Sequence, residues 1–183
     1  IPADKLRVIQ QRCQTTDDEP RWLVVLISDT GMRLSEAAGL AREDIVLDAD
    51  IPHIIIRPHP WRHLKTKGSE RTLPLVGCSL WAAERAVEAS QHSPYLFPRY
   101  CNDKGCKANS ASAALNKWLK QTIGDDYVMH SFRHSMRDRL RAVNCSTEMI
   151  DQIGGWSKKS VGESYGEGFE LRQTFQALYE ALQ

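Results

Sequence analysis

The chain has 183 residues, of which 42% are hydrophobic and 26% are charged, an ordinary composition for a globular domain. This length allows one domain with a sizeable hydrophobic core, so folding requires neither disulfides nor a structural metal. Lys and Arg number 24 against 23 Asp and Glu, and the resulting net charge of +1 excludes a polybasic tail protein or a histone-like binder. It does not exclude a nucleic-acid partner, because such binding depends on where the charges lie.

The five cysteines are odd in number and lack a repeated spacing, which argues against a disulfide framework and for a reducing, cytoplasmic location. Cys101 and Cys106 have the spacing of a metal knuckle, but no second ligand pair follows at zinc-finger spacing, so we expect no metal. The longest apolar run, residues 22–27, is far below the roughly 20 residues that cross a bilayer. With no signal peptide in view, we expect no membrane partner. The start at Ile1 rather than Met predicts a fragment of a longer protein.

The hydrophobic pattern predicts a mainly helical chain with a small antiparallel sheet inserted after the third helix (α+β). Thr30 and Gly31 end the second helix, and Ser35 is expected to cap a short third helix that runs to about Leu40. Three β-branched runs separated by turn residues follow. Residues 93–109 are predicted to form a loop. The other predicted helices cover 2–13, 20–29, 79–91, 110–122, 131–143, 147–153, 159–165 and 169–182, and the predicted strands cover 44–47, 53–57 and 71–75.

Positive charge is concentrated in two segments despite the balanced total. Residues 57–71 contain five basic side chains and one acidic one, and residues 133–141 contain four arginines against Asp138 alone. Each segment could be only a solvated surface. Two basic segments flanked by acidic ones nevertheless indicate an anionic partner.

The most informative stretch is residues 130–134, His-Ser-Phe-Arg-His. On a helix, Phe132 begins an apolar stripe that continues at positions 136, 140 and 143, whereas His130, Arg133, Arg137 and Arg141 fall on the other side. An arginine that can clamp an anion, next to a titratable histidine at a helix start, suits phosphoryl chemistry. The alternative is an arginine-rich surface helix with a histidine near its cap.

Three further segments are weak signals when each is taken alone. In residues 30–36, Thr-Gly-Met-Arg-Leu-Ser-Glu, a glycine turn delivers Arg33 between a buried helix and a capped one. Residues 65–71 form a basic turn between two predicted strands. Gly-Gly-Trp ends a helix at Trp156, and Tyr165 follows nine residues later. An isolated tyrosine is more often a core or surface residue than a nucleophile.

Together and in this order, these elements resemble the active site of the tyrosine recombinase (phage integrase) family. The most specific parts are the His-x-x-Arg-His box and the step from Trp156 to Tyr165. The resemblance spans essentially the whole chain and implies the tyrosine recombinase catalytic-domain fold. It implies one catalytic domain over residues 1–183, without the N-terminal core-binding domain. It also implies a site-specific recombinase or integrase that cleaves and rejoins DNA through a 3′-phosphotyrosyl bond, with no metal or nucleotide cofactor.

The resemblance also implies a role for each motif residue. Tyr165 would be the nucleophile, and Arg33 and Arg133 would hold the non-bridging phosphate oxygens and stabilise the transition state. His130 would assist proton movement at the tyrosine. Trp156 would donate its indole N–H to the phosphate.

A hairpin lysine would protonate the leaving 5′-oxygen, and Lys65 and Lys67 compete for this role. We favour Lys65, because Lys-Thr-x-x-x-x-Arg-x-x-Pro, over residues 65–74, is similar to the common family form. Further DNA contacts are expected from Arg57, Arg62, Lys67, Arg71, His134 and Arg137.

The implied partner is double-stranded DNA with attachment-type sites, on which the full-length, prokaryotic or phage-encoded protein would assemble as a tetramer. The predicted C-terminal helix, in residues 169–183, is hypothesised to dock on a neighbouring protomer through the stripe Leu171, Phe175, Leu178 and Leu182. The alternatives are a relaxing type IB topoisomerase, an inactive DNA-binding regulator of the same fold, and a zinc-binding interaction module.

Overall fold

In the computed structural model, which describes residues 1–66, 69–156 and 168–183, most of the chain is helical. The helices are α1 (Ala3–Thr16), α2 (Glu19–Thr30), α3 (Leu34–Ala38), η1 (Arg42–Asp44), α4 (Cys78–Ala89), α5 (Ala108–Ile123), α6 (Met129–Ala142), α7 (Thr147–Gly154) and α8 (Leu171–Ala181). The strands are β1 (Ile45–Val46), β2 (His53–Ile56), β3 (Arg71–Pro74), β4 (Cys101–Asn102) and β5 (Gly105–Cys106). None of these described helices has both the length and the apolar character of a membrane span. The predicted helix 159–165, which includes Tyr165, lies outside the described residues, as does Lys67.

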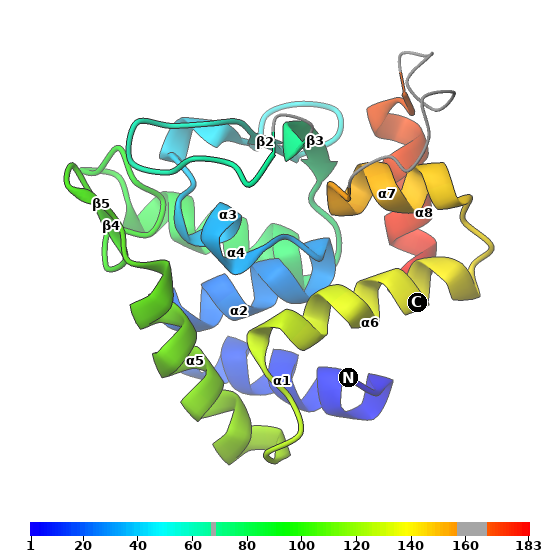
Figure 1. Ribbon diagram of the computed structural model, residues 1–183, viewed down its shortest axis with the longest axis horizontal. Helices are drawn as coiled ribbons and strands as arrows, with labels where there is room; N and C mark the ends of the chain where they lie inside the picture. Colours follow the sequence, from blue (N-terminus) through cyan, green and yellow to red (C-terminus); the bar gives the residue numbers. More distant parts are fainter. Residues whose placement is uncertain (67–68, 157–167) are drawn as a thin grey trace.

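Helix α2 forms the centre of the fold, with α1, α4 and α6 packed around it (Figure 1). Its run of apolar residues from Trp22 to Ile27 is buried. The Asp18 carboxylate caps its start by accepting a hydrogen bond from the backbone N–H of Arg21 at 3.1 Å. Gly31 ends it with φ at 66°, the left-handed conformation that glycine adopts most easily. The chain then turns directly into the segment that carries Arg33.

The predicted antiparallel sheet is present, in the order β1-β2-β3, and sits at one edge of the helical body (Figure 1). Its register places Ile54 opposite Leu73, and both side chains are fully buried. The connection from β2 to β3 carries Lys65. A second, two-stranded sheet of β4 and β5 lies within the segment predicted to be a loop, because two-residue strands are too short to produce a recognisable alternation.

Helix α3 does not begin as predicted. Its N-cap is Arg33, whose backbone N–H donates to the Glu36 carboxylate at 3.0 Å, and Ser35 is an exposed residue inside the helix. The prediction that Ser35 caps this helix was therefore wrong, since Glu36 reaches back to satisfy the free N–H.

Helix α8 packs against β3 and α6 of its own chain. Its buried residues are Thr174, Ala177, Leu178 and Ala181. Of the predicted stripe only Leu178 is fully buried, so the face in contact with the chain is rotated relative to that stripe. Docking of residues 169–183 on a neighbouring protomer stays a prediction.

Candidate active site

Residues from three helices meet around one cleft of about 270 Å³. Arg33 comes from the start of α3, and His130 and Arg133 come from the first turns of α6. Ser112 and Asn116 of α5 also line the cleft, and nothing in the sequence pattern of α5 had singled them out. The structure thus brings Arg33 together with His130 and Arg133, which lie about a hundred residues later in the chain.

Arg133 is almost fully buried, with 3% of its surface exposed, although the apolar stripe of α6 predicts it on the other side of that helix. Its Nη1 donates to the carbonyl oxygen of Gly31 at 2.9 Å, whereas its Nη2 has no hydrogen-bond partner within the described residues. Burial, followed by the nearby charge of Arg33, lowers the pKa of Arg133 to about 10. This buried cation, beside a second cation and with a free donor, is a site that an anion would complete.

Arg33 connects the start of α3 to the end of α7. Its Nη1 donates to Oε1 of Glu36 at 2.5 Å, and its Nη2 donates to the carbonyl oxygen of Gly155 at 2.9 Å. Glu36 is 2% exposed. Burial raises the pKa of its carboxyl, but the charges and hydrogen bonds of Arg71 and Arg33 outweigh burial, so the pKa lies below the ordinary value. Glu36 is therefore a buried, charged anchor for the two arginines.

Arg71 joins three segments rather than facing solvent. Its Nε donates to the carbonyl of Ile153 at 2.9 Å, its Nη1 to the carbonyl of Ser69 at 2.7 Å, and its Nη2 to Glu36 at 2.9 Å. The side chain is only 4% exposed. A Cβ added at Gly155 would lie 2.5 Å from Nη1, so this backbone packs directly on the guanidinium. Its burial makes Arg71 an internal link between these segments, and its predicted contact with DNA stays untested.

His130 lies at the edge of the cleft, and its ring meets the ring of His134 edge-on, with the ring centres 4.8 Å apart. Partial burial lowers the pKa of His130, and the positive charges of His134, Arg133, Arg33 and Lys65 lower it further. The ring is therefore neutral near pH 7, the state that can accept a proton.

Lys65 is exposed and lies near enough to the site to influence the pKa of His130. The choice of Lys65 over Lys67 as the hairpin lysine stays a prediction. Lys67 and Tyr165 lie outside the described residues, so their positions in the site stay predictions.

Trp156 lies beneath two arginines. The guanidinium of Arg133 is 4.2 Å from the centre of its ring system and that of Arg137 is 5.1 Å from it. Arg137 also lies 3.9 Å from a carboxylate oxygen of Asp151. These stacked cations hold the indole next to Arg133.

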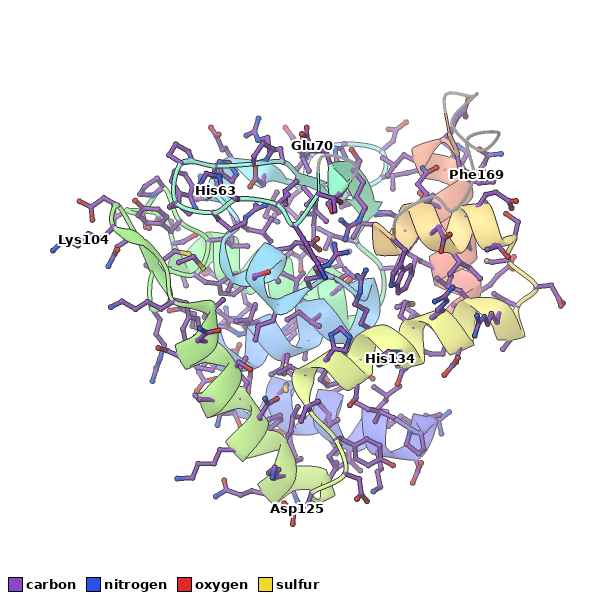
Figure 2. All side chains as sticks on the ribbon, viewed as in Figure 1. His63, Glu70, Lys104, Asp125, His134 and Phe169 are labelled. Atoms are coloured by element: carbon purple, nitrogen blue, oxygen red, sulfur yellow. The ribbon has the colours of Figure 1, made fainter. Side chains whose placement is uncertain are left out.

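The remaining predicted DNA contacts differ in exposure. Arg57 is 40% exposed but forms ion pairs with Glu43 and Asp44 at 2.7 and 2.8 Å. Arg62 is 4% exposed and lies buried against Gly39, and its predicted contact with DNA stays untested. His134 is exposed on α6. Figure 2 shows His134 near the centre of the view and Glu70, near the end of the β2–β3 connection, at its upper edge. His134 and Arg137 stay predicted DNA contacts.

Comparison with known proteins gives consistent matches. A family model described as the phage integrase family matches residues 1–169. Tyrosine recombinase XerC of Neisseria meningitidis serogroup B is 25% identical over 147 residues, which cover 78% of this chain and 46% of that protein. Tyrosine recombinase XerD of Corynebacterium glutamicum is 25% identical over 161 residues, which cover 81% of this chain and 48% of that protein. The chain therefore spans about half the length of these relatives.

Two solved structures of the Tn1549 transposon integrase share the fold. One is in complex with transposon right end DNA, with a TM-score of 0.59 over 97% of this chain and 64% of that one. The other is in complex with a circular intermediate DNA, with a TM-score of 0.58 over 100% of this chain and 65% of that one. Both are 16% identical to this chain. The likeness confirms the predicted fold.

Proposed function

Because the chain belongs to the phage integrase family, we propose that it is the catalytic domain of a site-specific recombinase that cleaves and rejoins DNA through a 3′-phosphotyrosyl intermediate. The observation that carries the proposal is the convergence of Arg33, His130 and Arg133 on one cleft. Two curated relatives are tyrosine recombinases, and solved neighbours are integrases bound to DNA, which agrees with this reading.

The arginines would bind the scissile phosphate of double-stranded DNA. Arg33 and Arg133 would donate to its non-bridging oxygens, and within the described residues the buried Nη2 of Arg133 has no other hydrogen-bond partner. Both arginines are held by bonds to backbone carbonyls, so little reorganisation accompanies the build-up of negative charge in the transition state. Donors fixed in advance at such a site typically contribute about 2.7–4 kcal/mol each.

The proposed first step is a transesterification. The oxygen of Tyr165 attacks phosphorus, a phosphotyrosyl bond to the 3′ side forms, and the bond to the 5′-oxygen breaks. Neutral His130 takes up the tyrosine proton, and Lys65 gives a proton to the leaving oxygen. The indole N–H of Trp156, held next to Arg133, would donate to the same phosphate.

In the second step, the 5′-hydroxyl of a partner strand attacks the phosphotyrosyl bond and releases the tyrosine. Each step exchanges one phosphodiester for another, so the reaction needs no nucleotide. We include in the proposal that the full-length prokaryotic or phage-encoded protein assembles as a tetramer on attachment-type sites in the cytoplasm.

The test is a nicked duplex made from the ends of the DNA element that encodes the chain. After cleavage, the nick lets the short strand that carries the free 5′-hydroxyl diffuse away. The DNA then cannot be rejoined, and the covalent intermediate is trapped. We expect a protein–DNA adduct without added metal, and peptide mapping should place the DNA on Tyr165. Tyr165→Phe should form no adduct, whereas Tyr179→Phe should form it normally, because Tyr179 is an exposed side chain on α8. An adduct that survives in Tyr165→Phe would overturn the proposed nucleophile.

The rate of DNA cleavage should fall as the pH is lowered, with a midpoint below pH 6.5. The pKa of His130 is lowered from 6.5, and protonation removes the base that accepts the tyrosine proton. The measurement is the single-turnover rate of adduct formation between about pH 5 and 8. His134→Gln should move the midpoint upward, because it removes a positive charge that lowers the pKa of His130. An unchanged midpoint in His134→Gln, or one above pH 6.5 in the unaltered chain, would argue against this role.

Lys65→Ala should slow adduct formation by about 10²- to 10⁴-fold, the usual contribution of a general acid. A substrate with a 5′-bridging sulfur should restore its rate, because a thiolate leaves without protonation. Lys67→Ala serves as the comparison and should need no such rescue. Rescue of Lys67→Ala alone would transfer the role to that lysine, and rescue of neither variant would reject both.

A further inference from the structure

The β4–β5 hairpin places two cysteines directly opposite one another. Cys101 pairs with Cys106 in the register of the hairpin. Just beyond this pair, the backbone N–H of Lys107 donates to the carbonyl of Tyr100 at 2.7 Å, which makes the cysteines a non-hydrogen-bonded pair. The Cα atoms of such pairs lie about 4.5 Å apart, and their side chains share one face. This separation falls within the range of about 4.4–6.8 Å found for disulfides.

The two thiols differ in accessibility. Cys101 is 2% exposed, and its Sγ donates to the carbonyl oxygen of Ala38 at 3.2 Å. Cys106 is half-buried. The neighbouring Cys101 thiol lowers the pKa of Cys106, and the charge of Arg62 adds to this against the effect of burial. The neighbouring Cys106 thiol and burial raise the pKa of Cys101. The more accessible thiol is therefore also the one that ionises more easily.

Arg62 gives the pair a buried positive charge. Its Nε lies 3.4 Å from the carbonyl of Gly39, but its Nη1 and Nη2 are buried without a hydrogen-bond partner in the part of the chain that the structure describes. The charge acts on both thiols. A guanidinium with free donors next to a thiol stabilises the thiolate, which is the form that reacts with disulfides.

We propose that Cys101 and Cys106 form a redox-active dithiol, with Cys106 as the attacking thiol and Cys101 as the resolving thiol, that exchanges with low-molecular-weight disulfides. The inference does not depend on the proposed recombination. The other cysteines lack this arrangement: burial raises the pKa of Cys13 to about 12, and burial also raises the pKa values of Cys78 and Cys145.

The exchange takes two steps. The thiolate of Cys106 attacks one sulfur of the small disulfide, the S–S bond of that molecule breaks, and one small thiolate leaves. Cys101 then loses its proton and attacks the sulfur of Cys106, which expels the second small thiolate and closes the Cys101–Cys106 bond. The chain loses two electrons and two protons, and the small disulfide gains both to become two thiols.

The test is incubation of the reduced chain with excess glutathione disulfide, followed by alkylation and peptide mapping. We expect a cross-linked peptide pair containing Cys101 and Cys106, no stable glutathione on either residue, and alkylated Cys78 and Cys145. Two fully alkylated cysteines at 101 and 106, or a persistent glutathione adduct on Cys106, would overturn the proposal.

Two variants separate the roles. Cys101→Ser should retain glutathione on Cys106, because the resolving thiol is absent and the serine hydroxyl can still donate to Ala38. Cys145→Ser, the matched control, should cross-link as the unaltered chain does. Retention of glutathione on Cys101 in a Cys106→Ser chain, at the rate seen on Cys106 in Cys101→Ser, would contradict the assigned order of attack.

Discussion

Replacing Arg133 by alanine should slow covalent adduct formation by about 100- to 1000-fold, the usual cost of removing one fixed donor to a transition-state oxyanion. Arg133 lines the cleft, and its Nη2 is unpaired among the described residues. In the proposed mechanism its contact to phosphate would strengthen as negative charge develops, so the loss should fall on the chemical step. The measurement is the single-turnover rate at saturating nicked DNA, which removes differences in affinity.

Arg137→Ala is the matched control, because Arg137 also stacks on Trp156 but does not line the cleft. We expect it to weaken DNA binding in a salt-dependent manner and to change the chemical rate only a few-fold. If both variants slow the chemical step equally, Arg133 contributes stacking on Trp156 rather than a contact to phosphate. Circular dichroism and a thermal melt of each variant establish that it is folded.

Replacing Arg71 by alanine should lower the free energy of unfolding by about 3–5 kcal/mol, the usual cost of breaking a buried ion pair. The change removes one of two arginine partners of the buried Glu36 carboxylate and leaves the carbonyls of Ser69 and Ile153 without this donor. Urea unfolding of both proteins measures the difference. Because the pKa of Glu36 is lowered, its stabilising effect should be complete above pH 4.5, the ordinary value, and be lost as the pH falls below it.

Arg85→Ala provides the comparison for this loss. Arg85 pairs with Asp17 and Glu88, and all three side chains are at least one-third exposed. Surface pairs of this kind contribute little to stability, because solvent screens them. An effect of Arg71→Ala no larger than that of Arg85→Ala would contradict the role of Arg71 as an internal link.

The helical periodicity of the sequence predicted most of the helices that position the site residues. The stripe of α6 at Phe132, Met136 and Leu140 is buried as predicted. The same pattern does not predict the burial of Arg133, because it describes one helix alone. The Gly31 turn and the ring of Trp156 cover this arginine, and both come from distant parts of the chain.

The concentration of positive charge at residues 57–71 did not predict which of its side chains are buried. A count of positive charges cannot tell which side chains point inward. Arg71 is buried where it pairs with Glu36, and this partner lies 35 residues earlier in the sequence. Arg62 is buried against Gly39, where the absence of a side chain leaves room for it. Both are tertiary contacts between segments distant in the sequence, and no local sequence pattern predicts them.

The bonds that hold the cleft together are distant in the sequence. The bond from Arg133 to Gly31 spans 102 residues, that from Arg33 to Gly155 spans 122, and that from Arg71 to Ile153 spans 82. Contacts of this separation require the closure of long loops and form slowly compared with single helices. During translation, a chain that has emerged only as far as α5 has neither His130 nor Arg133. If the proposed function holds, the capacity to cut DNA would thus arise only after these distant segments have been synthesised and have packed together.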